Sequence, residues 1–131
     1  MSKGNYMDKF YAGTKLEILE RSGRAVQHFH LKYLLTHEGE FHIFSDGIML
    51  GSWRKVNWDM IREITMEDDE VLSAKMFATQ ARLFFLKSAK PIKLLLVEGE
   101  VIYLYVNWKF GIGLSANVKV YEQIKEKCNK T

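Results

Sequence analysis

Histidines are the side chains of this sequence that could bind a metal, but their spacing places only two of them together as ligands. His28 and His30 are two residues apart, so on a strand they would share one face, about 7 Å from each other. A zinc site would need at least one more ligand. In the hairpin expected here, His42 lies opposite Leu34, roughly 13 Å from His30. We therefore expect solvated histidines and predict no metal site.

Other motifs for catalysis are incomplete. Cys128 is the only cysteine, has no histidine near it in the sequence, and falls in the apolar stripe of a predicted helix. Gly111 and Gly113 precede that helix, but the further glycine and the Lys-Ser/Thr pair of a phosphate loop are missing. The acidic run Glu67–Glu70 is typical of an exposed loop. These observations predict a chain that is not an enzyme and binds no cofactor.

The charge of the chain is mildly positive, with a net value of +3. Nucleic-acid-binding domains concentrate Lys and Arg on one face. Here acidic residues are spread among the basic ones, although three tryptophans could in principle stack on bases. We therefore predict no nucleic-acid partner.

Alternating apolar residues predict a series of short antiparallel strands. Turn residues separate them, most clearly the predicted hairpin loops at residues 37–39, 45–47 and 98–100. Residues 71–87 allow either a helix or two strands, with a strand preferred at Leu83–Leu86. The strands are predicted at Thr14–Arg21, Val26–Leu35, Glu40–Phe44, Ile48–Trp53, Arg62–Glu67, Ile92–Val97 and Val101–Val106.

A helix from about Ser115 to Cys128 should follow the last strand. Its predicted buried stripe recurs at helical spacing and comprises Val118, Tyr121, Ile124 and Cys128. The chain of 131 residues has the size of one domain. We predict a loose lead over residues 1–13 and a single domain over residues 14–131. With no signal-like or membrane-length apolar run, and with one cysteine, we expect a cytoplasmic protein.

Two segments resemble pleckstrin-homology-like (PH-like) domains of the GRAM and bacterial type. Residues 41–50 (FHIFSDGIML) are similar to the third and fourth strands of that family, and residues 56–64 (VNWDMIREI) to the turn that leads into its next strand. The resemblance implies a mainly β, partly open antiparallel barrel of seven to nine strands, closed by one C-terminal helix. It also implies binding to anionic lipid headgroups, for which Arg21 and Arg24 are the candidates.

The run Val101–Val106 is apolar on both faces of its predicted strand. An antiparallel strand with one wet face should instead alternate between apolar and polar residues. Either both faces are covered within the chain, in part by the C-terminal helix, or one face meets a partner. For the second case the candidate interface residues are Ile102, Tyr103, Leu104 and Tyr105. We predict a non-enzymatic module for protein recognition or self-association. Peripheral membrane binding is the alternative.

Overall fold

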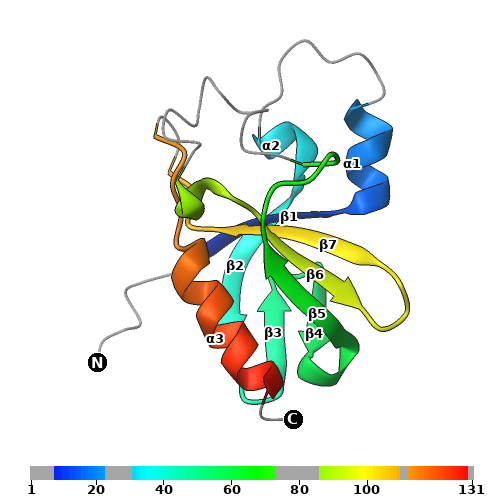
Figure 1. The fold of residues 1–131 in the computed structure, drawn as a ribbon, viewed down its shortest axis with the longest axis vertical. Helices are drawn as coiled ribbons and strands as arrows, with labels where there is room; N and C mark the ends of the chain where they lie inside the picture. Colours follow the sequence, from blue (N-terminus) through cyan, green and yellow to red (C-terminus); the bar gives the residue numbers. More distant parts are fainter. Residues whose placement is uncertain (1–7, 23–30, 73–85, 110–111, 130–131) are drawn as a thin grey trace.

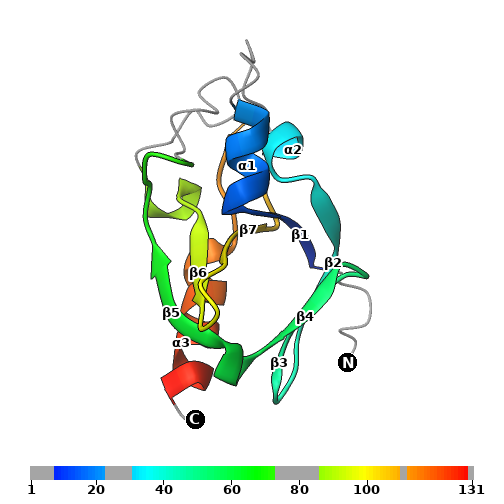
Figure 2. The same ribbon diagram turned by 90° about the vertical axis from the view of Figure 1, so that its right-hand side faces the viewer.

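A computed structural model describes residues 8–22, 31–72, 86–109 and 112–129 of the chain. In this part, seven strands form one antiparallel sheet that curls into a half-barrel (Figures 1 and 2). The strands are β1 (Lys9–Thr14), β2 (His37–Ile43), β3 (Gly47–Leu50), β4 (Arg54–Asn57), β5 (Ile61–Met66), β6 (Ile92–Leu96) and β7 (Val101–Val106). The helices are α1 (Lys15–Ser22), α2 (Leu31–Leu34) and α3 (Asn117–Asn129), with 3₁₀ turns η2 (Trp58–Met60) and η4 (Lys87–Ala89).

The strand order in the sheet is β4-β3-β2-β1-β7-β6-β5. The first strand therefore lies at the centre and pairs with both β2 and β7. The outermost strands, β4 and β5, are consecutive in sequence and are connected by η2. Helix α3 packs against β5, β7 and both 3₁₀ turns. The predicted class, a mainly β antiparallel half-barrel with a C-terminal helix, is confirmed.

Two of the predicted hairpins are present. In the first, Ile43 of β2 lies opposite Ile48 of β3. In the second, Leu95 of β6 lies opposite Val101 of β7. Gly99 in the second turn has φ of 103°, a left-handed value that glycine adopts without steric cost. These hairpins were predictable because the turn residues and the apolar strand residues on both sides of them are close together in the sequence.

Strand β7 is covered on both faces by the chain itself. Ile102 and Leu104 belong to a core enclosed by the half-barrel and α3, together with Ile124. Tyr103 and Tyr105 belong to a second core on the opposite face of the sheet. The second core is completed by apolar residues of α1, α2, the 71–72 segment and the chain after β7, namely Ile18, Leu31, Leu34, Leu35, Val71, Leu72 and Trp108. Two covering layers explain why the run is apolar without interruption.

The N-terminal prediction is wrong for both of its described elements. Residues 9–13, expected in a loose lead, form most of the central strand β1, and Thr14–Arg21, expected as a strand, is mainly helix α1. A capping box fixes where α1 begins. The Thr14 N–H donates to Glu17 Oε1 at 2.9 Å, and the Glu17 N–H donates to Thr14 Oγ1 at 3.2 Å. The Thr-x-x-Glu signature was available in the sequence, but the alternation of Leu16 and Ile18 also suits a strand.

The segment leading into β2 also differs from the prediction. Leu31–Leu34, expected at the end of a strand, is the single helical turn α2, whereas residues 23–30 lie outside the described part. Residues 37–39, expected as a hairpin loop, begin β2 and pair with β1. The expected register placed Phe41 opposite Leu35, but Phe41 lies opposite Leu50. The proposed strand at 83–86 falls almost wholly outside the described residues, and Leu86 itself is in a bend.

Helix α3 is confirmed, with a stripe shifted from the predicted one. Its buried residues are Asn117, Val120 and Ile124; Tyr121 and Cys128 pack only partly against the core. The Asn117 Oδ1 accepts from the Val106 N–H at 2.8 Å, so the first residue of the helix is bonded to β7. No helix in the described part of the chain is long and apolar enough to cross a membrane.

Candidate functional site

The two arginines expected to bind an anion are not gathered into a described site. Arg21 lies in the last turn of α1, but its side chain is outside what the structure describes, as is the whole of Arg24. The same helix carries Lys15 together with Glu17 and Glu20. Its charges are therefore mixed, which does not favour an anion.

The four residues expected at an interface are buried within the chain. Ile102, Tyr103, Leu104 and Tyr105 each have 0% of their surface exposed. The expectation that one pair faces a partner is therefore wrong. The face of β7 that carries Tyr103 and Tyr105 is covered by α1 and α2. Both segments were predicted as strands, so this covering layer was not expected.

The described histidines make contacts that the sequence did not indicate. His42 on β2 lies opposite Met49, not Leu34, and its Nε2 is 3.2 Å from Glu40 Oε1. His37 begins β2, with its Nε2 2.9 Å from Glu17 Oε2 on α1. Within the described ranges, no three His, Cys, Asp or Glu side chains gather as metal ligands would. His28 and His30 lie outside those ranges.

Cys128 occupies a structural position near the end of α3. It is partly buried against the core of the half-barrel. Burial raises the pKa of its thiol, which lowers the fraction of the nucleophilic thiolate near neutral pH. The position and the ionisation both favour a packing role.

A groove of about 380 Å³ lies between α1 and the turn that joins β6 to β7. Figure 1 shows α1 above this turn, on the right of the view. Leu16 is 78% exposed and Leu19 is 45% exposed on α1, while Val97 on the turn is 59% exposed. Large apolar side chains that gather at the surface mark interaction sites more often than scattered ones do. The groove is lined by Thr14, Lys15, Leu16, Leu19, Gly99, Glu100 and Val101.

A second, more polar hollow of about 260 Å³ adjoins this groove. It shares Lys15 and Val101 with the groove and extends over the outer side of β5 and β6. Acidic and basic side chains both contribute to it. Its remaining lining residues are Glu63, Thr65, Glu67, Lys93 and Leu95. The two hollows together form a surface that is apolar beside α1 and of mixed charge beyond it, as protein interfaces commonly are.

Several basic side chains on the described surface are paired with carboxylates. The nitrogen–oxygen distances of four such pairs lie between 2.8 and 3.0 Å. Local pairing reduces the positive potential that phosphate backbones or anionic lipids would require. The pairs are Arg54–Glu100, Lys55–Asp46, Lys90–Asp68 and Lys93–Asp69.

Asp69 attaches the loop after β5 to the outer face of the sheet. Its Oδ2 accepts from the Tyr103 hydroxyl at 2.7 Å and from the Lys93 ammonium at 2.8 Å. Its Oδ1 accepts from the N–H groups of Val71 and Leu72, each at 2.8 Å. Burial raises the pKa of Asp69, but the hydrogen bonds from Lys93, the backbone and Tyr103 outweigh it, and the net pKa is lowered. Burial and this carboxylate both raise the pKa of Tyr103, which keeps its hydroxyl a donor.

We expect Asp69 to make the fold sensitive to acid. Because its folded-state pKa is below the ordinary value of 3.8, its stabilisation is complete above that value and is lost as the pH falls through the folded one. Asp69→Asn should lower the free energy of unfolding at pH 7 and flatten its decline between about pH 4 and 2. Urea unfolding over this range measures both effects, with exposed Asp59→Asn as the control. Equal pH slopes for the two variants would contradict the assignment.

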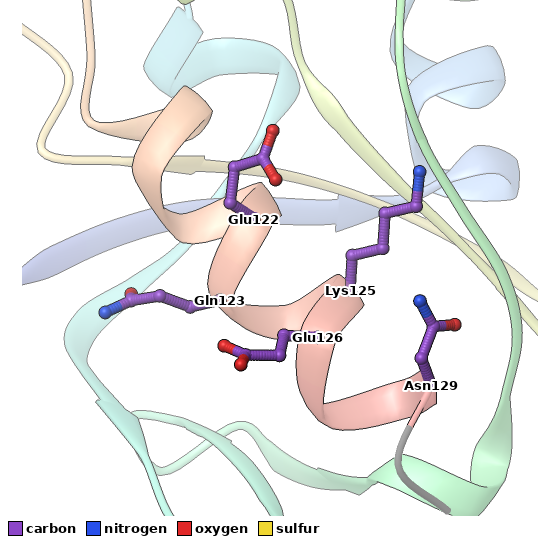
Figure 3. A pocket seen from close by; sticks show the side chains of 5 residues that line it. All are labelled: Glu122, Gln123, Lys125, Glu126 and Asn129. Carbon is purple, nitrogen blue, oxygen red and sulfur yellow. The ribbon is translucent and has the colours of Figure 1, made fainter.

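Another hollow, of about 470 Å³, runs along the exposed side of α3. Five polar residues of that one helix line it, and in Figure 3 Gln123 and Glu126 extend to one side while Lys125 and Asn129 extend to the other. Side chains that diverge in this way do not converge on a ligand. The candidate site is therefore the groove beside α1.

Comparison of the chain with protein-family models, with curated proteins and with solved structures gives no match. The groove, its exposed leucines and its mixed charges must therefore carry the functional interpretation. They favour contact with a protein surface over chemistry on a small substrate.

Proposed function

We propose that this chain is a non-enzymatic, PH-like binding module that associates with a second copy of itself through the α1 patch. The α1 patch is defined as the exposed residues Lys15, Leu16 and Leu19 of α1, together with exposed Val97 and half-buried Glu100 of the β6–β7 turn. The observation that carries the proposal is the 78% exposure of Leu16 directly beside a hollow. The PH-like part rests on the seven antiparallel strands of the half-barrel and on the C-terminal helix.

The α1 patch is complementary to itself in both shape and charge. A two-fold symmetric contact brings the same surface of both copies together, so each feature must find its counterpart within the patch. Leu16 projects from the surface, and the groove next to it offers a hollow of the kind that a leucine side chain fills. Lys15 and Glu100 line the same groove with opposite charges.

The size of the α1 patch sets the strength of the proposed contact. Full burial of a leucine or valine side chain contributes roughly 1.5–3 kcal/mol, and association costs at least about 4 kcal/mol. Stable interfaces use about 20–30 residues on each side, far more than the exposed apolar residues available here. The proposed dimer is therefore reversible, with a dissociation constant in the micromolar range or weaker. The sequence predicted self-association through β7, whereas the proposed contact uses the α1 patch.

Leu16→Glu should abolish the self-association. Sedimentation velocity over roughly 5–500 μM should show the average mass of the wild type rising with concentration and that of the variant remaining monomeric. A charged residue at 78% exposure leaves the fold intact, which circular dichroism checks. Phe44→Glu is the matched control, because Phe44 is 45% exposed on the β2–β3 turn, away from α1. A wild type that stays monomeric at the highest concentration rules the proposal out.

Anionic lipid is the competing ligand of the α1 patch, and co-sedimentation with vesicles tests it. The lipid hypothesis rests on Lys15 and the exposed leucines of α1, although Glu17 and Glu20 lie on the same helix. If the chain self-associates and does not bind lipid, it should stay in the supernatant when vesicles containing phosphatidylserine are sedimented. Salt-sensitive co-sedimentation that Leu16→Glu removes, together with a monomeric wild type, would replace self-association by membrane binding.

A further inference from the structure

A continuous set of contacts connects α1, through residues of β2 and β4, to the turn between β6 and β7. His37 Nε2 lies 2.9 Å from Glu17 Oε2. The His37 ring stacks on Trp53 with a centroid distance of 3.8 Å and an interplanar angle of 5°. The Arg54 guanidinium carbon is 5.4 Å from the centroid of the Trp53 ring, and its Nη1 donates to Glu100 Oε1 at 3.0 Å. These residues come from α1, β2, the β3–β4 turn, β4 and the β6–β7 turn.

Glu17 is held in place independently of His37. Its Oε1 accepts from the Thr14 N–H in the capping box, which leaves Oε2 directed to the imidazole. The pair is only partly exposed, with 27% of the His37 side chain and 31% of the Glu17 side chain accessible. Burial raises the pKa of Glu17, but the hydrogen bonds from Thr14 and His37 outweigh it, and the pKa is lowered. The carboxylate is therefore charged throughout the range in which imidazoles titrate.

We propose that His37 is a pH-sensitive latch that holds α1 against the half-barrel more firmly when its imidazole is protonated. A neutral imidazole can hydrogen-bond Glu17, but an imidazolium adds a charge to that bond. The same charge adds a cation–π contribution to the stacking on Trp53. Imidazole is the side chain that ordinarily changes charge between pH 5 and 8.

The surrounding charges favour this direction. Glu17 on α1 contacts the ring directly, and Arg54 on β4 reaches it only across Trp53. Glu100 on the β6–β7 turn neutralises Arg54. On β1 the residue opposite His37 is Ala12, which carries no charge. The carboxylate of Glu17 is therefore the dominant charge at the imidazole, and protonation increases the attraction.

Hydrogen exchange of the α1 backbone amides tests the latch. After correction for intrinsic rates, protection of α1 in the wild type should rise about two- to fivefold as the pH falls from about 8 to 5.5. His37→Gln should show no such rise. Glu17→Gln should also remove it while keeping the capping box, since glutamine serves there as well as glutamate. If His37→Gln fails to fold, the pH dependence of α1 protection in Glu17→Gln still tests the latch.

His42→Gln is the matched control. His42 also contacts a glutamate, but Glu40 lies on the same strand, so that pair connects no second element. Its removal should leave the α1 profile unchanged. The latch is overturned if wild type and Glu17→Gln have the same pH profile, or if His42→Gln alters the profile as much as His37→Gln does.

The latch does not depend on the proposed dimer. Repeating the exchange measurement on Leu16→Glu tests it in a chain that lacks the exposed leucine. If self-association through the α1 patch also holds, dimerisation should strengthen over the same fall in pH and lose that dependence in Glu17→Gln. A pH-dependent α1 without any dimer would leave the latch standing and remove only the proposed function.

Discussion

Lysine at Tyr103 or at Leu104 is expected to unfold the protein, although the two side chains lie on opposite faces of β7. Both residues are 0% exposed, and each belongs to a different core. At Leu104 the ammonium is buried without a partner, which costs several kcal/mol. At Tyr103 it replaces the hydroxyl that donates to Asp69, beside the Lys93 ammonium that already pairs with this carboxylate. At both positions the large side chain is lost as well. Together these penalties approach the roughly 5–15 kcal/mol that stabilises an ordinary domain. Loss of dispersed amide signals in NMR spectra and of a cooperative thermal transition measures the effect.

Lysine variants of Tyr103 and Tyr105 distinguish a buried face of β7 from a face that binds a partner. If Tyr103 and Tyr105 faced a partner, their lysine variants would be folded monomers. Tyr105→Phe is a conservative control, since it keeps the ring and removes the hydrogen bond from the Tyr105 hydroxyl to the Ala89 carbonyl, which is 2.7 Å long. It should remain folded and lose about 1 kcal/mol. If the Tyr103→Lys and Tyr105→Lys proteins were folded monomers, this face of β7 would be accessible to a partner.

The part of the fold that sequence could predict is the part whose signals are local. The turn at residues 45–47 and the turn around Gly99 each carry their own glycine, and apolar strand residues stand directly on both sides of each turn. The apolar run of β7 was also recognised, but what covers it depends on residues far away in sequence. Ile18 and Leu31 cover its tyrosine face, and both were assigned to strands. That error removed the covering layer and turned a buried strand into an apparent interface.

The candidate site shows the same division between local and distant information. The capping box of Thr14 and Glu17 spans three residues, so it was readable from the sequence and would have placed Leu16 on a helix. The contact between Glu17 and His37 joins residues 20 positions apart, and that between Arg54 and Glu100 joins residues 46 apart. No periodicity encodes such pairs. They follow from the curl of the sheet, which brings distant turns to one rim.

Asn117→Ala is expected to lower the free energy of unfolding by about 3 kcal/mol or more. Asn117 is 0% exposed, and its Oδ1 accepts from the Val106 N–H at 2.8 Å. Its Nδ2 donates to the carbonyls of Lys90 at 2.8 Å and Leu104 at 3.3 Å. Each buried group left without a partner costs about 1–3 kcal/mol. Urea unfolding followed by circular dichroism measures the loss.

Two further variants identify the amide hydrogen bonds as the cause. Gln123→Ala removes an amide of the same kind from the exposed side of the same helix and should change the stability by less than about 0.5 kcal/mol. Asn117→Asp keeps the oxygen for the Val106 N–H but replaces the donor to both carbonyls with a second oxygen. At pH 7 it should destabilise at least as much as alanine does, because a buried carboxylate then faces carbonyl oxygens. Protonation restores one donor, so its stability relative to Asn117→Ala should recover in acid. An Asn117→Ala protein as stable as Gln123→Ala would mean that water replaces the amide, and that apolar packing, chiefly of Val120 and Ile124, holds α3 to the sheet.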